Sequence, residues 1–347
     1  MIMKDSTLDG YIYAKVCGML SKSFVGGGFH RLQSVTSLEG LWNLLFSSEC
    51  PSISPAELAE AIEHKSEGLF LEEFISLLEF QSCPPQFLID LIRLYDYENL
   101  KELLFISFKD NDSSAKLPEM NHIDPFSMLH YDKWPNVKSL VAGSPVEWCA
   151  TTGSEVSQLE LESHLDLQYI RTLWNSIDRL PASMGDSIKK MLKDELLLDN
   201  LVWSLRLRVY FGMEGKDVLQ RLVTLEDVSD INDISRDVLA GPIVKTLDYS
   251  INNYEAWNKS GYSPLLNPPQ ENELWTIDPR WINSVAHRKL FQQWKKRLHQ
   301  NNELPHVLYC WFKIKRYELD CIRAVTECLR LGLPIGQVND VLNISAV

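Results

Sequence analysis

Apolar residues recur at the spacing of an α-helix through much of this 347-residue chain. Between residues 87 and 108 they fall at positions 88, 91, 92, 95, 100, 103 and 104, which form one face of a helix. The same period predicts helices over residues 165–177, 184–213, 285–300 and 305–331. Alternation with a period of two, which is typical of a half-buried strand, is rare. The pattern therefore predicts an all-α fold.

Two short motifs predict where helices begin. In Ser54-Pro55-Ala56-Glu57 a serine can cap the helix, a proline suits its first position, and a glutamate can complete a capping box. Thr36-Ser37-Leu38-Glu39 has the same shape ahead of an apolar run. We expect a helix to start directly after the first residue of each motif.

Two stretches interrupt the helical pattern. Residues 110–160 contain prolines at 118, 125 and 135, and residues 241–283 contain prolines at 242, 264, 268, 269 and 279. Both are typical of irregular connections between helices. They divide the chain into three predicted helical blocks, residues 1–115, 116–240 and 241–347.

One helix in each block carries a similar sequence. Residues 95–101 read YDYENLK, and residues 317–323 read YELDCIR, which agrees position by position in residue type. Residues 198–201 read LDNL, a looser copy followed by Arg206. The copies are separated by 101 and 121 residues, counted from Asn99 to Asn200 and from Asn200 to Cys321. A period of this length indicates a repeated helical subdomain rather than a short solenoid repeat.

Asn99 and Asn200 lie beside the apolar faces of their predicted helices. A buried amide must find hydrogen-bond partners or lose about 1–3 kcal/mol. The two asparagines therefore either tie their helices to a neighbouring backbone or hold a ligand, and the structural tie is the commoner case. We interpret Asp96 and Lys101, in the first copy, as an ordinary solvated pair or a cap contact.

Charge is unevenly distributed along the chain. The formal net charge of −13, from 47 acidic and 34 basic residues, argues against a protein that mainly grips nucleic acid. Residues 39–116 hold 15 acidic and 5 basic residues, whereas residues 281–330 hold 10 basic and 4 acidic ones. The densest basic run is Lys295, Lys296 and Arg297. It is either a solvated helix face or a docking surface for an acidic partner or anionic lipid head groups.

No catalytic, cofactor or metal motif stands out. The glycine run at residues 26–28 lacks the lysine and serine of a phosphate-binding loop, and it suits a flexible break between helices. Gly212 and Gly215 follow a long predicted helix and suit its C-cap. His122, Asp124, His130 and Asp132 share one loop, but their spacing matches no helical metal motif. We therefore expect no cofactor and no bound metal, although a dispersed enzyme site would involve these four residues.

Several features bear on location. The longest apolar run, residues 307–312, is far shorter than the roughly 20 residues of a membrane-spanning helix. The N-terminus shows no secretory signal. The seven cysteines are scattered, without any CxxC, which is typical of free thiols in a reducing compartment. We expect a protein that faces the cytoplasm and does not cross a bilayer by itself.

The ordered motifs resemble one family. The chain is similar to the C-type subunit of the archaeal- and bacterial-type rotary V/A-ATPases, the counterpart of the eukaryotic d-type subunit. The segment YIYAKV at residues 11–16 resembles the family's first helix, with Lys15 in place of an arginine. The copies at 95–101 and 198–201, and the segment FKIKRYEL at residues 312–319, resemble its later motif helices. Gly332, Leu333 and Pro334 follow in the expected order, and Cys321 departs from the usual asparagine.

The resemblance implies a fold and a function. It implies three pseudo-symmetric helical subdomains that form a funnel-shaped, non-catalytic protein without a cofactor. Such a protein would link the central-stalk rotor subunits to the membrane proteolipid ring on the cytoplasmic face, and would transmit torque for proton or sodium transport. Carried over residue by residue, the family motifs contribute these structural positions: Asp96, Asn99, Lys101, Asn200, Arg206, Glu318 and Arg323. An unrelated helical scaffold or interaction protein is the alternative.

Overall fold

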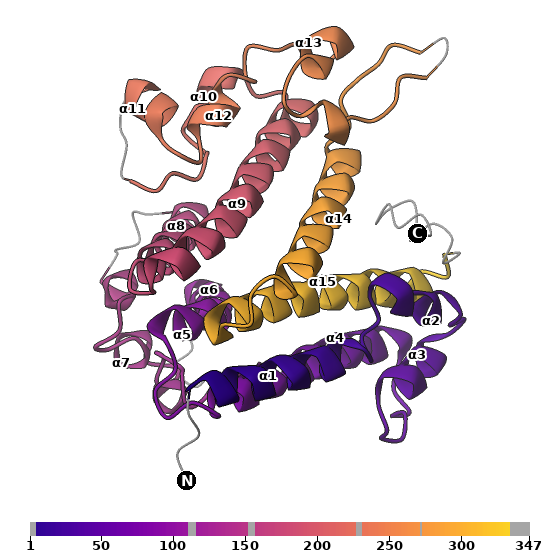
Figure 1. Ribbon diagram of the computed structural model, residues 1–347, viewed down its shortest axis with the longest axis vertical. Coiled ribbons are helices and arrows are strands. Elements are labelled where there is room, and N and C mark those ends of the chain that lie inside the picture. The colour runs from indigo at the N-terminus through magenta and orange to yellow at the C-terminus, as the bar shows by residue number, and fades with distance from the viewer. Residues whose placement is uncertain (1–4, 110–115, 152–156, 227–230, 271–272, 334–347) are drawn as a thin grey trace. The chain divides into compact units, whose positions relative to one another are not determined.

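The structure is a computed structural model that describes residues 5–109, 116–151, 157–226, 231–270 and 273–333 (Figure 1). These residues form α-helices, short 3-10 helices and loops, and no strand occurs among them. The predicted all-α fold is therefore confirmed. Its arrangement as three pseudo-symmetric subdomains in a funnel stays a prediction.

The chain folds into two compact units. The first unit combines Met1–Glu63 with Asp186–Val347, and the second is the continuous segment His64–Gly185. The first unit is thus assembled from both ends of the chain. The boundaries fall inside two helices, α4 (Pro55–Leu78) and α9 (Ala182–Phe211). The division into three blocks at residues 115 and 240 stays a prediction.

The first unit is built around its two C-terminal helices. Helix α15 (Leu304–Arg330) contacts both α14 (Pro279–Leu298) and α1 (Asp5–Leu20), as Figure 1 shows. The remaining elements of this unit are η1 (Gly26–Gly28), α2 (His30–Gln33), α3 (Leu38–Leu45), α10 (Gly215–Leu219), α11 (Ile231–Arg236), α12 (Gly241–Val244), α13 (Tyr254–Asn258) and η4 (Ser263–Leu265).

Burial explains why α15 is central. Each of its residues from 304 to 314 is buried, so the helix is covered on all sides along its first three turns. Ile12 and Val16, four residues apart on α1, are fully buried in the same unit. A run that is too short to span a bilayer therefore serves as the core of a globular unit. Among the residues that the structure describes, no helix has both the length and the apolarity to cross a membrane.

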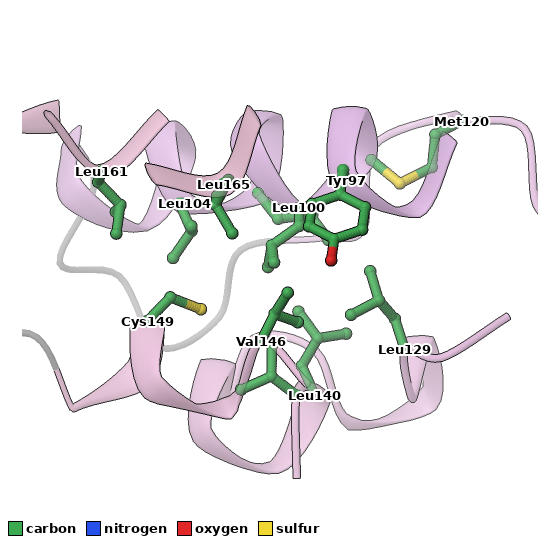
Figure 2. Close-up of a cluster of buried hydrophobic side chains, with 12 residues drawn as sticks. Tyr97, Leu100, Leu104, Met120, Leu129, Leu140, Val146, Cys149, Leu161 and Leu165 are labelled. Carbon is green, nitrogen blue, oxygen red and sulfur yellow. The ribbon is translucent and has the colours of Figure 1, made fainter. Parts of the chain in front are cut away.

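The second unit has its own apolar core, which Figure 2 shows in close-up. Side chains of α6 (Leu94–Lys109) and α8 (Gln158–Ile177) point toward a layer formed by residues 129–149. Leu100, Leu140 and Leu165 are fully buried there. The other elements of this unit are α5 (Gln86–Ile92), η2 (Tyr131–Lys133), α7 (Val137–Leu140) and η3 (Glu147–Ala150). The predicted irregular stretch 110–160 thus supplies half of a core.

The capping motifs are confirmed at one site and wrong by one residue at the other. Ser54 and Glu57 form a reciprocal capping box, in which the Glu57 N–H donates to Ser54 Oγ (3.3 Å) and the Ser54 N–H to Glu57 Oε2 (2.9 Å). In the second motif Ser37, not Thr36, is the N-cap, because its hydroxyl accepts from the Gly40 N–H at 3.0 Å. Helix α3 therefore begins at Leu38.

The single helix predicted over residues 87–108 is wrong, because the chain forms α5 and α6 with a break at Arg93. The Arg93 side chain holds this turn: Nε donates to the Phe126 carbonyl (3.1 Å) and Nη1 lies 3.4 Å from Asp90 Oδ1. Neither glycine nor proline marks the position, so the pattern of apolar residues continues across it.

The glycines after α9 differ from their prediction in one case. Gly212 has φ of +63°, so it is the left-handed residue expected just after a helix end. Gly215 instead begins α10.

The start of helix α8 also differs from its prediction. The helix begins at Gln158, seven residues before the predicted start, because Ser157 and Glu160 form a further capping box.

Candidate functional site

Asp96 is the centre of a buried polar network in the second unit. Its Oδ1 accepts hydrogen bonds from Ser127 Oγ (2.8 Å) and Tyr131 Oη (3.0 Å), and its Oδ2 accepts from the Met128 N–H (2.6 Å). Burial raises the pKa of the Asp96 carboxyl, and these three donors oppose that rise. The interpretation of Asp96 as half of a solvated pair is therefore wrong: its side chain ties α6 to the loop that follows.

Asn99, one helical turn later on α6, ties the same loop. Its Nδ2 donates to the Asn121 carbonyl and to Tyr131 Oη, both at 2.8 Å. Asn121 Nδ2 in turn donates to the His64 carbonyl at 3.1 Å. These are the contacts that the sequence predicts for a buried amide that binds backbone.

Asn200 makes the equivalent tie in the first unit. Its Nδ2 donates to the Val223 carbonyl (2.9 Å), and the Val223 N–H donates back to Asn200 Oδ1 (2.8 Å). The partner lies 23 residues downstream, compared with 22 for Asn99 and Asn121. The two copies of the motif therefore use one structural device, in which a helix amide holds the backbone of the following loop.

The third copy uses a different residue for its tie. Cys321 stands at the asparagine position, fully buried, and burial raises the pKa of its thiol. Glu318, one turn earlier, accepts a hydrogen bond from the Phe24 N–H and pairs with Lys315. The loop held by this helix therefore comes from the start of the chain, which the order of residues alone does not reveal.

Two of the basic motif residues, Lys101 and Arg323, form ion pairs between elements of the same unit. Lys101 on α6 pairs with Asp166 on α8, so Asp96 is not its partner. Arg323 on α15 pairs with Glu63 at 3.1 Å, and its Nη1 lies 3.7 Å from Asp320 Oδ1. Each of these cations thus connects helices that are distant along the chain.

A buried ion pair joins α9 to α15 in the first unit. Lys313 Nζ lies 2.7 Å from Glu195 Oε1, and the two side chains are only 10% and 18% exposed. Tyr309 Oη donates to the other Glu195 oxygen at 3.4 Å. Sequence reasoning missed this pair, although a lysine directly after a six-residue apolar run on a buried helix is a signal of a charge that needs a partner.

Asp199 extends this pair into a group of charges that we name the Asp199 cluster: Glu195, Asp199, Arg206, Lys313 and Arg316. The side chain of Asp199 is exposed to solvent and lies near these charged groups. Partial desolvation by the surrounding protein atoms and the neighbouring Glu195 raise its pKa to about 7, and the three cations oppose that rise. Arg206 is thus placed near Asp199.

His287 on α14 faces the same charges. Burial lowers the pKa of its imidazole, and Arg206 and Arg316 lower it further, whereas Asp320 and Glu195 raise it. Three helices, α9, α14 and α15, therefore bring titratable groups to one place in the first unit.

The Asp199 pKa leads to a prediction about pH. Because its pKa is higher in the folded protein than the ordinary value near 3.9, the folded state binds an extra proton between roughly pH 4 and pH 7. This carboxyl therefore makes the protein less stable as pH rises through that range. We expect Asp199→Asn to remove this loss, so that the variant gains stability over the wild type between pH 5 and pH 8 in denaturant unfolding.

Asp186→Asn is the matched control, because Asp186 is an exposed carboxyl on the same helix. Its unfolding free energy is expected to follow that of the wild type across the pH series. Parallel curves for Asp199→Asn and the wild type would contradict the raised pKa.

The residues of the predicted basic run lie at the surface to different degrees. Lys295 and Lys296 near the end of α14 point to solvent, and Arg297 is half-buried. Among the residues that the structure describes, no carboxylate forms an ion pair with Lys295 or Lys296. Lys295 and Lys296 are thus unneutralised within the described part of the chain, and the role of the basic run in docking stays a prediction.

The loop histidines and aspartates do not assemble into a site. His122 packs edge-on against Tyr131, with ring centroids 4.2 Å apart, and Asp132 pairs with the adjacent Lys133 at 2.7 Å. The side chains at 122, 124, 130 and 132 are all exposed. Within the described ranges, no three His, Cys, Asp or Glu side chains gather as a metal site would require.

These features define an all-helical protein in which recurring buried polar residues tie helices to loops. Residues 12–340 match the family of ATP synthase (C/AC39) subunits, and the chain belongs to that family. It is also similar to a protein of Treponema pallidum (strain Nichols) that is described only as an uncharacterized protein. The two are 26% identical over 335 residues, which cover 96% of this chain and 95% of the Treponema protein.

Proposed function

We propose that this protein is the non-catalytic central-stalk adaptor of a membrane rotary V/A-type ATPase. It links the central rotor shaft to the membrane proteolipid ring and transmits torque for the transport of protons or sodium ions. It acts as a peripheral protein on the cytoplasmic face of the membrane. The family match along nearly the whole chain supports the proposal.

The observation that carries the proposal is a solvent-facing stripe on α9. Asp199, Trp203, Arg206 and Tyr210 are spaced by four, three and four residues, so they lie on one face of this 30-residue helix. Trp203 and Tyr210 are 42% and 51% exposed. Tryptophan, tyrosine and arginine are the residues enriched at the energetic centres of protein interfaces. We name these four residues the α9 stripe and propose that it contacts the stalk.

A protein that transmits torque must resist shear between its helices. The bond between Lys313 and Glu195 fixes α15 to α9, and Gln293 Nε2 on α14 donates to Asp194 Oδ2 on α9 at 2.8 Å. Three long helices are thus cross-linked by polar contacts beside the α9 stripe. This arrangement is suited to a load-bearing part.

Co-purification from detergent-solubilised membranes tests the proposal. A tagged wild-type chain is expected to recover the ATPase head, stalk and ring proteins. Trp203→Ala with Arg206→Glu is expected to reduce the recovered stalk by about tenfold or more, since loss of one interface hot spot weakens binding by at least that factor. Leu274→Ser, at a residue 80% exposed and outside the stripe, is the control and should recover a full complex.

A second arm of the same experiment addresses the basic run. Lys295→Glu with Lys296→Glu should weaken assembly while leaving the helical content unchanged, if this run docks an acidic partner. Lys289→Glu is matched to it, because Lys289 is an exposed lysine on the same helix outside the run. If the wild-type chain recovers none of the other ATPase proteins, the function is refuted, whereas unchanged recovery with the charge reversals would remove only the docking role.

A further inference from the structure

A pocket of about 370 Å³ lies in the first unit, apart from the α9 stripe. Its walls come from the end of α1, the turn that contains the glycine run, and the last turns of α14. Ile314 of α15 also lines it. We name it the Lys295 pocket. Its volume is in the range of small-molecule sites in proteins.

The floor of the Lys295 pocket is apolar. Val25, Phe291, Leu298 and Ile314 line it, and all four side chains are buried. Leu20 adds a half-buried apolar wall. The part of a ligand that contacts this floor must therefore be apolar, because a polar group there would lose its hydration without gaining a hydrogen-bond partner.

The rim of the pocket is polar and positively charged. Lys295, His299 and Ser21 line it and are exposed, and none of the residues that line the pocket is acidic. His299 Nδ1 lies 2.9 Å from the hydroxyl of Tyr13, which fixes the orientation of the imidazole. Within the described part of the chain, Lys295 has no carboxylate partner. The rim therefore favours an anion over a cation or a neutral group.

The glycine run lines one side of the pocket with backbone atoms, because glycine has no side chain. At Gly28 a side chain is excluded, because a Cβ atom would lie 2.1 Å from the Ser23 carbonyl oxygen. Gly26 has φ of +57°, and a Cβ atom there would stand 3.6 Å from Phe291 and 3.7 Å from Lys295 Nζ. The run is therefore a tight turn that sets its backbone against Lys295, rather than the flexible break predicted from its composition.

From this division into a buried apolar floor and a cationic rim, we infer that the Lys295 pocket binds an amphipathic anion. The guest has a single alkyl chain that fills the floor and a carboxylate or phosphate head that pairs with Lys295. A free fatty-acid anion and one acyl chain of an anionic phospholipid share this chemistry. The site involves none of the residues of the α9 stripe, and it shares only Lys295 with the basic run whose docking role is tested separately.

Cys17 provides a readout of occupancy, because it lines the pocket and its side chain is only half-buried. The experiment follows iodoacetamide alkylation of Cys17 in the purified full-length chain by peptide mass spectrometry. Decanoate, below its critical micelle concentration, is expected to slow this reaction in a saturable manner. Cys83, an exposed thiol in the other unit, is the internal control and should react at an unchanged rate.

Three comparisons identify the chemistry of the guest. Decanoate should protect Cys17 better than decanol does, and decyltrimethylammonium should not protect it. Each methylene added to the alkyl chain should tighten binding about fourfold until the chain fills the pocket. Lys295→Gln should weaken decanoate binding about tenfold, as expected for the loss of one charged hydrogen bond. Lys296→Gln, at an exposed neighbour that does not line the pocket, should change it little.

Vesicles distinguish the two sources of the anion. Protection by phosphatidylglycerol vesicles, but not by phosphatidylcholine vesicles or by monomeric decanoate, would assign the site to a membrane lipid. Protection by decanoate alone would assign it to a free fatty acid. The inference is overturned if no anionic amphiphile protects Cys17, if the cationic one protects equally, or if Lys295→Gln and Lys296→Gln bind decanoate alike. Recovery of the ATPase complex does not enter these readouts, so this inference and the proposed function can fail separately.

Discussion

Replacing Glu195 with alanine is expected to lower the free energy of unfolding by about 3 kcal/mol. The change leaves the Lys313 ammonium in a largely buried position without the carboxylate that lies 2.7 Å from it. Loss of one partner of a buried ion pair costs about 3–5 kcal/mol. The lower end applies because Asp199 also attracts Lys313. Denaturant unfolding at pH 8 measures the effect.

A double-mutant cycle separates this penalty from lost packing. Lys313→Met combined with Glu195→Ala removes both charges, so it should recover most of the stability that Glu195→Ala loses. Glu214→Ala is the surface control, because Glu214 and Lys216 are 73% and 71% exposed and such pairs contribute about 0–1 kcal/mol. If Glu195→Ala costs no more than Glu214→Ala, then Lys313 does not depend on its partner.

Replacing Asp96 with alanine is expected to cost about 2–5 kcal/mol, because the Met128 N–H and the Tyr131 hydroxyl lose their acceptor and each unsatisfied group costs about 1–3 kcal/mol. The Ser127 hydroxyl loses its bond to Asp96 but still has the Leu129 carbonyl at 3.4 Å. The donors belong to Ser127, Met128 and Tyr131, so the loop should loosen first. Hydrogen exchange of peptides that cover residues 120–131 is expected to accelerate strongly, and that of peptides from α14 should not change.

Asp132→Ala controls for the loss of a carboxylate in the same region. Asp132 is exposed and pairs only with its neighbour Lys133 among the described salt bridges. Its removal should leave exchange in the loop near the wild-type rate. Equal acceleration in both variants would show that Asp96 does not hold the loop.

The helices could be predicted from the sequence because their signals are local. An apolar stripe with a capping motif specifies a helix within a few turns, as at Ser54 and along α15. The break at Arg93 could not be predicted in this way, because the turn is held by the carbonyl of Phe126, which lies 33 residues away. When a helix is ended by a tertiary contact, the periodic pattern of apolar residues continues across the break and does not reveal it.

The same distinction between local and distant contacts applies to the residues of the candidate site. Asn99 and Asn200 were predictable as buried amides, because a polar residue beside an apolar stripe must be satisfied. Their partners lie within about two dozen residues. The tie of Glu318 to Phe24 spans 294 residues and the pair of Lys313 with Glu195 spans 118, so neither could be inferred from spacing. The residue types were visible in the sequence, but the pairs were not.

The interrupted first unit has a consequence for synthesis on the ribosome. The second unit is continuous, so all of its residues have emerged once Gly185 leaves the exit tunnel, and it can fold while the chain is still growing. Helix α1 must instead wait for α15, its packing partner near the other end of the chain. Ile12 and Val16 lie on this helix, and the contacts of α1 with α15 can form only after residues 304–330 have been made. The nascent chain thus carries α1 without its α15 partner while the residues between them are made, and an apolar segment in that state is suited to binding by a ribosome-associated chaperone.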